Sequence, residues 1–422
     1  MAKVYPDRST TVKSSAANAA EAPHSGRRLA IAHFLLGRCN PNSANGIDQC
    51  VYHVSRNQAA QGHEVSLYSL TRKDPLPIPG VRVRTYAPAF ELPSVLPGSL
   101  TDILVDRSPA AVPRKLVADL LDDAPDIVHM HHTQVPANVV VGNRAGAAGI
   151  PYCVTLHGAL VGEARNRRRF LKTVYRIVWE RNHLDRAAFL HAISRADADG
   201  ARALGFRAPI EVVPNGIDVG PRPHLEPDDL GLRFPELRGR RIITFVGRLD
   251  PEQKGLDLLC EALGRSGANL GLLLVGPTFR GGRGKLESLV RRLQLADRVA
   301  FAGPVFGHEK RRILAGSAAF VHTSRWEAGV PFSVLEAAAA GIPCLVSEAA
   351  DPDAVLEEGG GGVRVELDVE SIADGLRALD GATEAELKSM GAHGREVVRR
   401  EFSWERIARK LTSLYEAHGC PR

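Results

Sequence analysis

The most constraining feature of this 422-residue sequence is the alternation of short apolar runs with helix-length amphipathic stretches, which occurs in two successive series. Such runs are typical of buried parallel strands, and a helix between two of them predicts a crossover connection. In the first series we expect strands at Leu29–Leu36, Glu64–Leu70, Val81–Tyr86, Asp126–His131, Tyr152–Leu156, Phe189–Ile193 and Ile210–Val213. In the second we expect them at Arg241–Val246, Leu270–Val275, Arg298–Ala302, Ala318–Thr323 and Pro343–Ser347.

Amphipathic stretches between these runs predict helices at Ile47–Gln61, Arg114–Leu121, Arg167–Asn182, Leu256–Leu263, Leu286–Leu293, Glu309–Leu314 and Val334–Ala340. Two more are expected at Ala385–Arg400 and Trp404–Ala417, the second with Ser403 as its N-cap. The glycine run Gly359–Gly362 is predicted to be a turn entering Val363–Val365. Each series should form one α/β unit, and a ligand should bind in the cleft between the two units.

A polar, proline-rich connector at Gly216–Glu236 separates the two series. We therefore expect a disordered tail at residues 1–26, an N-terminal domain at 27–215, a C-terminal domain at 216–401 and a terminal helical segment at 402–422. The scattered cysteines predict reduced thiols, and no apolar run is long enough for a membrane span or a signal peptide. These features predict a cytoplasmic location. A net charge of +6 is compatible with nucleic acid, anionic lipid or phosphorylated small molecules.

The segment Thr244–Asp257 has the features of an anion site. A predicted strand ends at Val246, and Arg248 and Lys254 flank the loop that leads into the next helix. Two cations beside a helix N-terminus favour a diphosphate, because fixed charges and free N–H groups point at one place. The alternative is a pair of solvated surface cations. The segment is not a Walker A motif.

The segment Phe320–Pro343 carries two glutamates. Glu327 lies in the loop after a strand, and a helix should begin near Pro331. Glu336 is expected about one turn into that helix, at the edge of an apolar face. A pair of sugar hydroxyls would satisfy its carboxylate there; the alternative is a structural glutamate paired with a lysine or arginine.

Together these segments resemble the retaining glycosyltransferases of family 4, which have the GT-B fold. Motifs in the same order are Asp126–His131, Val154–Gly158, Val213–Asp218, Val246–Gly255, Ser324–Pro343 and Phe402–Trp404, and the resemblance covers about residues 28–418. It implies two Rossmann-like domains that face each other across a cleft, with the C-terminal helix crossing back to the N-terminal domain.

The resemblance also implies roles for individual residues. Arg248 and Lys254 would hold the diphosphate of a nucleotide-sugar donor, and Glu336 would bind the ribose. His157 would lie near the donor sugar and the attacking hydroxyl. Other donor contacts would come from Gly46, Glu327, Val330, Pro331, Phe332 and Ser333. The catalytic group would then be His157, Arg248, Lys254 and Glu327.

Two departures from the family pattern affect these roles. Eight residues separate Glu327 from Glu336, one more than the family keeps, and we place the additional loop residue at Ala328. The first loop has Gly46 alone where the family has a glycine pair, so Asn45 is expected to adopt the left-handed conformation instead.

The resemblance implies a nucleoside-diphosphate sugar and a glycan or lipid-linked acceptor as partners, in the synthesis of a bacterial surface polysaccharide or glycolipid. No cofactor and no metal are expected, because the sequence lacks an evident Asp-x-Asp clamp and two cations can stabilise the leaving group. One alternative is a nucleotide-sugar epimerase or hydrolase on the same fold. Another is a basic nucleic-acid-binding protein, which no nucleic-acid motif supports, so no nucleic-acid partner is expected.

Two further features are open to more than one interpretation. His129, His131 and His132 invite a metal-site hypothesis, but on a strand His132 faces away from the other two, so we expect no metal there. The basic segment Arg165–Arg181 could contact an anionic membrane at the inner face of the cell membrane; the alternative is a helix with one face in the core.

Overall fold

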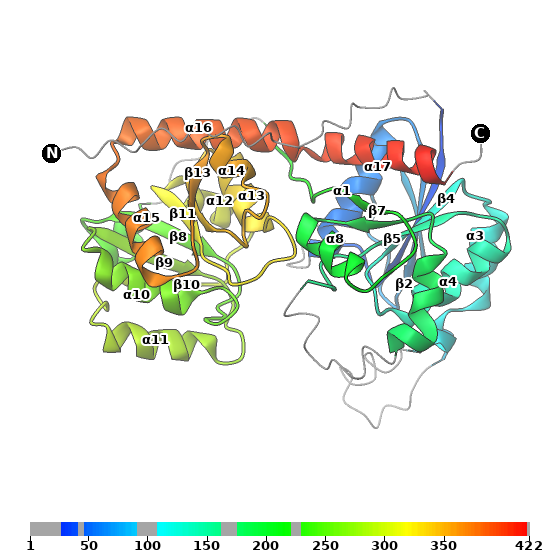
Figure 1. Ribbon diagram of the computed structural model, residues 1–422, viewed down its shortest axis with the longest axis horizontal. Coiled ribbons are helices and arrows are strands. Elements are labelled where there is room, and N and C mark those ends of the chain that lie inside the picture. Colours follow the sequence, from blue (N-terminus) through cyan, green and yellow to red (C-terminus); the bar gives the residue numbers. More distant parts are fainter. Residues whose placement is uncertain (1–26, 41–45, 91–107, 162–174, 221–228, 420–422) are drawn as a thin grey trace.

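The computed structural model describes residues 27–40, 46–90, 108–161, 175–220 and 229–419. The predicted tail at residues 1–26 and the residue Asn45 lie outside them. Two parallel sheets organise the described chain (Figure 1). The strand order is β3-β2-β1-β4-β5-β6-β7 in the first sheet and β10-β9-β8-β11-β12-β13 in the second. Two Rossmann-like domains of this kind confirm the predicted GT-B architecture.

All strands predicted for the first series are present. They are β1 (Ala30–Leu36), β2 (Glu64–Leu70), β3 (Val81–Tyr86), β4 (Ile127–His131), β5 (Tyr152–Thr155), β6 (Phe189–Ala192) and β7 (Ile210–Val212). The last strand of the first sheet therefore ends before the predicted domain boundary, and the first strand of the second sheet begins after it.

The second sheet contains one strand more than predicted. The expected strands are β8 (Arg241–Val246), β9 (Leu270–Val275), β10 (Val299–Gly303), β11 (Ala319–His322) and β12 (Cys344–Ser347), and β13 (Gly362–Val365) is additional. The predicted turn at Gly359–Gly362 was therefore too long by one residue, because Gly362 already pairs with Cys344. A Cβ at Gly362 would lie 2.4 Å from the carbonyl oxygen of Cys344, so the close pairing requires glycine.

The predicted helices appear with small changes in their ends, except the one at Arg167–Asn182, of which residues 167–174 lie outside the described part of the chain. In the N-terminal domain they are α1 (Gly46–Ala60), α3 (Arg114–Asp122), a π-helical turn (Arg176–Glu180) and α7 (Arg181–Asp185). In the C-terminal domain they are α10 (Leu256–Ser266), α11 (Gly282–Arg292), α12 (Gly307–Ala315), α13 (Phe332–Ala339) and α16 (Glu384–Glu401), followed by α17 (Trp404–His418). Helices not predicted are α4 (Pro136–Ala147), α8 (Arg195–Arg202), α9 (Leu230–Arg233), α14 (Val355–Glu358) and α15 (Val369–Gly381).

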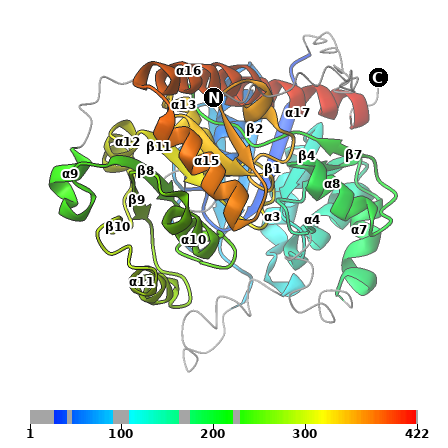
Figure 2. The ribbon, with the colours of Figure 1, turned by 60° about the vertical axis from the view of Figure 1, so that its left-hand side comes forward.

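Helices cover both faces of each sheet (Figure 2). In the N-terminal domain, α1 and α17 cover the face that contains Ile31 and Val65, and α3 and α4 cover the face that contains Phe34. In the C-terminal domain, α10, α11 and α15 cover one face, and α12, α13 and α16 cover the other. Strands buried on both faces explain why the sequence shows continuous apolar runs rather than strict alternation.

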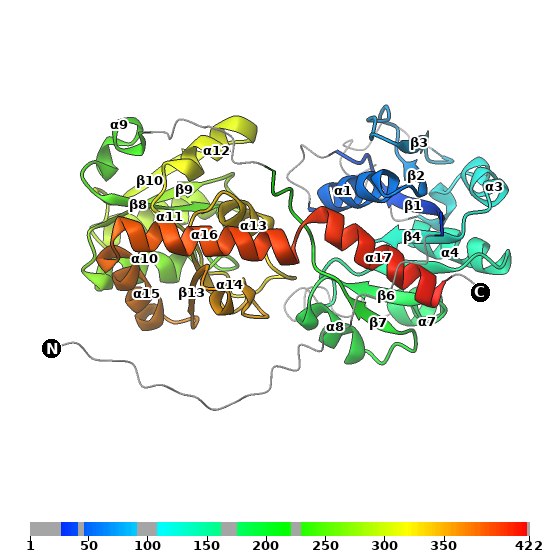
Figure 3. The same cartoon turned by 90° about the horizontal axis from the view of Figure 1, so that it is seen from above.

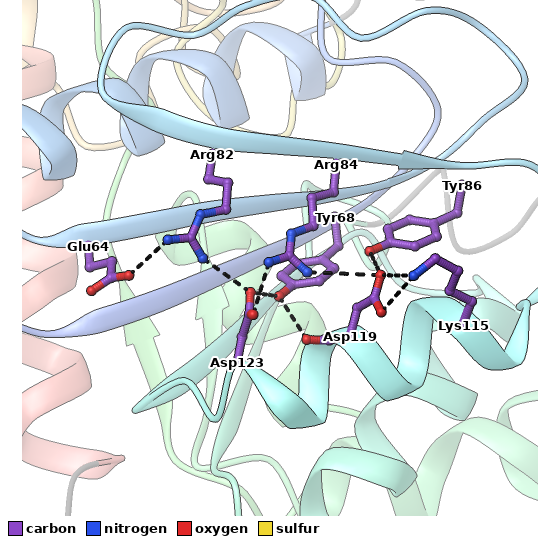
Figure 4. A network of polar contacts seen from close by, with 8 residues as sticks. All are labelled: Glu64, Tyr68, Arg82, Arg84, Tyr86, Lys115, Asp119 and Asp123. Carbon is purple, nitrogen blue, oxygen red and sulfur yellow. Dashed lines mark hydrogen bonds and ion pairs between the residues drawn. The ribbon is translucent and has the colours of Figure 1, made fainter.

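A polar network fixes α3 against the edge of the first sheet (Figure 4). Tyr68 donates to Asp123 at 2.5 Å, and Tyr86 donates to Asp119 at 2.7 Å. Arg84 pairs with Asp123 at 2.9 Å. These contacts pair Asp119 of α3 and Asp123 at its C-terminal end, so we interpret the network as structural.

The C-terminal helices connect the two domains. α16 lies over the C-terminal domain and α17 over the N-terminal domain, where it packs on α1 (Figure 3). At the crossing, the amide of Ile217 donates to the carbonyl of Phe402 at 2.7 Å. Ser403 occupies the predicted N-cap position of α17 but makes no side-chain capping bond. The predicted crossing back of the C-terminal helix is confirmed.

Trp404 is the apolar centre of this crossing. It is only 2% exposed and stacks on His53 of α1, with 5.2 Å between ring centroids. The ring of Phe332, in α13 of the other domain, lies 6.2 Å away. A Cβ at Gly216 would lie 2.5 Å from the Trp404 ring, so the connector passes directly against it.

We expect Trp404→Ala to lower the free energy of unfolding by about 3–5 kcal/mol, because it leaves a large cavity where the domains and connector meet. Trp179→Ala is the matched control, since Trp179 is 58% exposed and its truncation should change stability by about 0.5 kcal/mol or less. Urea unfolding followed by circular dichroism measures both. Equal effects of the two substitutions would contradict this role of Trp404.

Candidate active site

A cleft of about 2090 Å³ separates the two domains. One wall comes from α1, through Gly46, Gln49, Tyr52 and His53. The other comes mainly from loops and helix starts that follow the strands of the second sheet. Of the predicted site residues, the cleft is lined by Gly46, Arg248, Lys254, Pro331, Phe332, Ser333 and Glu336. His157, Glu327 and Val330 are not part of this lining, although Glu327 contacts a residue that is.

Glu327 lies beneath the cleft in a ring of donors. Its carboxylate forms an ion pair with Lys254 and accepts hydrogen bonds from Ser324 at 2.6 Å and from Nε2 of His322 at 3.1 Å. Burial alone would raise the pKa of Glu327, but the charge of Lys254 and the bond from His322 outweigh it and lower that pKa to about 2. Glu327 is therefore ionised at neutral pH, and it holds the charged end of Lys254 in place.

Arg248 is the exposed cation of the predicted pair. It donates to Gln253 at 3.1 Å, and its guanidinium stacks on the ring of Phe279 at 4.7 Å. Gly276 next to it has φ +146°, and a Cβ there would lie 1.8 Å from the carbonyl oxygen of Gly247. The ends of β8 and β9 therefore approach each other closely, and this approach requires glycine at position 276.

Glu336 is paired with a lysine of the neighbouring helix. Both of its oxygens accept from Lys310 of α12, at 2.7 and 2.9 Å. This contact matches the structural alternative considered for Glu336, yet both residues line the cleft. The sequence did not identify Lys310 as a site residue. A lysine in a predicted surface helix is not by itself a sign of a site, and the sequence does not show that α12 lies beside α13.

The N-terminus of α13 faces the N-terminal domain. The ring of Phe332 would be 3.0 Å from a Cβ at Gly46, so a side chain at position 46 would displace that ring. Phe332 and Ser333 are the first residues of α13, and their N–H groups belong to the unpaired set at any helix start. The cleft therefore combines a helix N-terminus with two cations, an arrangement that favours a phosphate ligand.

His157 and Glu327 are brought toward the same place by a contact between two loops. A Cβ at Gly158 would lie 1.9 Å from that of Ala328, and Ser194 donates to the carbonyl of Ala328 at 2.6 Å. Ala328, the residue predicted to be the additional loop residue, thus contacts the N-terminal domain. His157 and Glu327 each directly precede a residue of this contact.

A cluster of buried histidines lies behind His157. Ring nitrogens of His33, His129 and His131 lie within 4.8 Å of one another, close enough to hold a metal ion. His132 is not in this group; it has φ +73° and its ring contacts the carbonyl of Thr133. The sequence missed His33, because its position beside His129 follows from the pairing of β1 with β4.

Part of the predicted basic segment lies outside the described residues, which resume at Tyr175. Val178 and Trp179 are 60% and 58% exposed. Glu180, the next residue, is only 2% exposed, so the described end of the segment has both exposed and buried side chains, as the alternative with one face in the core predicts. Among the helices of the described ranges, none has both the length and the apolar character needed to cross a bilayer.

Comparison with protein-family models gives two matches that together follow the two domains. Residues 45–216 match the model described as a glycosyl transferase 4-like domain, and residues 240–380 match the glycosyl transferases group 1 model.

The chain belongs to glycosyltransferase family 4.

Several curated proteins are similar to this chain. It is 29% identical over 284 residues to the 2-deoxystreptamine N-acetyl-D-glucosaminyltransferase of Streptomyces fradiae, covering 62% of this chain and 65% of that protein. It is 27% identical over 391 residues to the phosphatidyl-myo-inositol mannosyltransferase of Mycobacterium leprae, covering 87% and 95%. The match to spore coat protein SA of Bacillus subtilis is 29% over 191 residues, 43% of this chain and 50% of that protein. The chain thus spans about half to two thirds of the length of some relatives and nearly all of another.

Solved structures support the fold of the family. The structure of Anabaena Alr3699/HepE in complex with UDP has a TM-score of 0.68 at 19% identity and covers 92% of this chain and all of that chain. The sucrose-phosphate synthase of Thermosynechococcus elongatus has a TM-score of 0.69 at 21% identity, covering 92% and 99%.

We expect the free energy of unfolding of this protein to decrease as the pH is lowered from about 6.5 to about 4. Burial lowers the pKa of His33, His183 and His191 to about 4, so the unfolded chain gains protons in this range that the folded protein does not. This contribution to stability is complete above the pKa of histidine in the unfolded chain, about 6.5, and is lost as the pH falls toward the lowered pKa of the folded protein. Each such histidine should contribute a slope of about 1.4 kcal/mol per pH unit.

Urea unfolding at a series of pH values measures this slope. His183→Gln should reduce it by about one proton, and His308→Gln, at an exposed histidine, should leave it unchanged. Equal stability of the wild-type protein at pH 7 and pH 5 would contradict the prediction.

Proposed function

We propose that this chain is a retaining glycosyltransferase that moves a sugar from a nucleoside-diphosphate sugar to a hydroxyl group, in the synthesis of a surface polysaccharide or glycolipid. The observation that carries the proposal is that Arg248, Lys254 and the first residues of α13 all line the cleft between the domains. Two fixed cations and free helix N–H groups stabilise a diphosphate as it leaves the sugar. The family match and the relatives that are named glycosyltransferases support the same reaction class.

In this proposal the donor lies with its diphosphate on Arg248 and Lys254 and its ribose at Glu336. Lys310 now holds Glu336, so ribose hydroxyls would share that carboxylate with the lysine or displace it. The donor sugar would extend toward Glu327, Val330 and His157. The acceptor, a glycan or a lipid-linked sugar, would enter from the N-terminal domain. Two relatives from Mycobacterium tuberculosis, named as mannosyltransferases that act on a phosphatidylinositol monomannoside, support a lipid-linked acceptor.

The charges favour attack on the same face from which the diphosphate departs. The bond from the anomeric carbon to the phosphate oxygen breaks, the bond to the acceptor oxygen forms, and the acceptor proton passes to the leaving phosphate. Glu327 is an unsuitable nucleophile for double displacement, because its carboxylate is occupied by Lys254, His322 and Ser324. A covalent sugar trapped on Glu327 would contradict this mechanism.

We expect release of nucleoside diphosphate from one class of sugar donor only when an acceptor is present. The cations replace a metal in this proposal, so the rate should not change when EDTA removes divalent ions. Lys254→Ala should lower the rate by about 10²–10³-fold, and Lys285→Ala, at an exposed lysine outside the cleft lining, should not change it. A coupled assay of diphosphate release with UDP-, GDP-, ADP- and dTDP-sugars measures these rates.

Release of diphosphate at full rate without an acceptor would favour the hydrolase alternative, and loss of activity in EDTA would contradict metal independence. The nucleic-acid-binding alternative would be favoured by salt-sensitive binding to any duplex together with no turnover of any donor.

We further propose that the enzyme contacts the inner, cytoplasmic face of an anionic membrane through Arg165–Arg181. Residues 165–174 lie outside the described part of the chain, so the support comes from the segment's end. Val178 and Trp179 are exposed there beside Arg181, and tryptophan with neighbouring cations favours a lipid headgroup region.

Sedimentation with vesicles tests this contact. We expect the protein to bind vesicles of phosphatidylglycerol more than vesicles of phosphatidylcholine, and Trp179→Ser to weaken that binding several-fold. Leu367→Ser, at an exposed apolar residue of the other domain, is the control. Binding that does not depend on lipid charge or on Trp179 would contradict the proposal.

A further inference from the structure

A continuous row of buried polar groups leads away from His157 into the N-terminal domain. It begins in the loop after β5, passes through β4, β1 and α1 to the C-terminal helix α17, and returns through β4, β5 and β6. In order, the groups are His157, His131, His33, Gln58, Tyr415, His129, Thr155, His191 and the carbonyl of Val213. Each neighbouring pair of polar atoms lies between 2.5 and 3.2 Å apart.

We call the part from Tyr415 to Val213 the far half of this row and the part from His157 to Gln58 the near half. Which atom donates in each hydrogen bond of the far half follows from its last member. The carbonyl of Val213 can only accept, so Nε2 of His191, at 2.7 Å, carries a proton. Burial lowers the pKa of His191, so the ring is neutral and its Nδ1 accepts from the hydroxyl of Thr155 at 2.8 Å. The oxygen of Thr155 must then accept from Nε2 of His129 at 2.5 Å.

The same reasoning continues through α17 and α1. With Nε2 protonated, neutral His129 accepts at Nδ1 from the hydroxyl of Tyr415 at 2.6 Å. The oxygen of Tyr415 accepts from the side-chain amide nitrogen of Gln58 at 3.2 Å. This turns the amide oxygen of Gln58 toward His33, so Nε2 of His33 donates to it at 2.8 Å.

The donors and acceptors of the near half are then fixed as well. Neutral His33 accepts at Nδ1 from Nε2 of His131 at 3.2 Å, and neutral His131 accepts at Nδ1 from Nε2 of His157 at 3.2 Å. Burial lowers the pKa of all three rings, so none carries a second proton at neutral pH. His157 is left with an unprotonated Nδ1, which no hydrogen bond reaches among the described residues.

We infer that Gln58 is a positioning residue of the active site, which acts through His33 and His131 to hold His157 as a hydrogen-bond acceptor for a sugar hydroxyl. The inference rests on the proposed function, which puts His157 beside the donor sugar. An imidazole that is neutral and resists protonation accepts a hydrogen bond but does not retain the proton. This agrees with a mechanism in which the phosphate receives the acceptor's proton.

The row also gives the histidine cluster a role without a metal. In the order derived above, both ring nitrogens of His33, His129 and His131 are engaged in hydrogen bonds, and each bond has one donor and one acceptor. A metal ion at this cluster would have to break at least two of these bonds. The same bonds connect α17 to the active site, because Tyr415 orients the amide of Gln58.

Nitrogen-15 NMR of protein labelled at histidine tests the assignment directly, and His157→Gln identifies the signals of His157. We expect a pyridine-type shift for Nδ1 and a pyrrole-type shift for Nε2 of His157 in the wild-type protein at neutral pH. A protonated Nδ1 would overturn the inference. So would stoichiometric zinc in the purified protein that His33→Ala removes. This measurement needs no substrate, so it stands apart from the proposed function.

Gln58→Leu tests the positioning role. It removes the acceptor of His33, so the near half of the row can reverse and move the proton of His157 to Nδ1. We expect the two shifts of His157 to exchange and kcat/KM for the donor to fall about tenfold, the effect of one lost hydrogen bond. Ser55→Ala is the matched control, because the buried hydroxyl of Ser55 bonds to Val51 on the same helix, outside the row.

The control should lose stability but keep both the shifts of His157 and the kinetics. If Gln58→Leu behaves like Ser55→Ala in all three measurements, Gln58 is only structural and the inference is wrong. If no sugar donor is turned over by the wild-type protein, the proposed function fails while the NMR result still decides the state of His157.

Discussion

The parallel direction of both sheets is the constraint on which the rest of the structure depends. In a parallel sheet every strand ends at the same edge, so the loops that follow the strands gather there. Lys254, Glu327 and His157 are far apart in the sequence, but each follows a strand, β8, β11 or β5. The contact of Gly158 with Ala328 brings these edges together, and Trp404 fixes the crossing helix where the two domains meet.

The buried and half-buried charges at the cleft are paired with each other. Lys254 is nearly buried, and an unpaired ammonium there would be costly; Glu327 neutralises it. Lys310 and Glu336 form a second pair at the half-buried wall. Both lysines are therefore held in place by ion pairs, whereas Arg248 is an exposed cation of the cleft lining. A ligand phosphate would add to the first pair rather than separate it, since Glu327 is also held by His322 and Ser324.

Local signals in the sequence were sufficient for most of the fold. Buried strands show as apolar runs, and the cations of Thr244–Asp257 lie within one loop. Features that depend on distant pairing could not be predicted. β13 is short and begins with Gly362, and α4 has an apolar valine run with little amphipathic pattern. Lys310 reaches Glu336 only because α12 and α13 are neighbours. The row behind His157 joins Gln58 to Tyr415 across 357 positions, and nothing local to either residue indicates it.

The central claim is that the cleft binds a nucleoside diphosphate through Lys254. Thermal unfolding of the wild-type protein and Lys254→Ala with UDP, GDP, ADP and dTDP tests it most directly. A nucleotide at 100 times its dissociation constant should stabilise the fold by about 2.7 kcal/mol. The account predicts that one nucleotide raises the unfolding midpoint of the wild-type protein by a few degrees and has little effect on Lys254→Ala. No shift with any nucleotide at millimolar concentration, or an equal shift in both proteins, would contradict it.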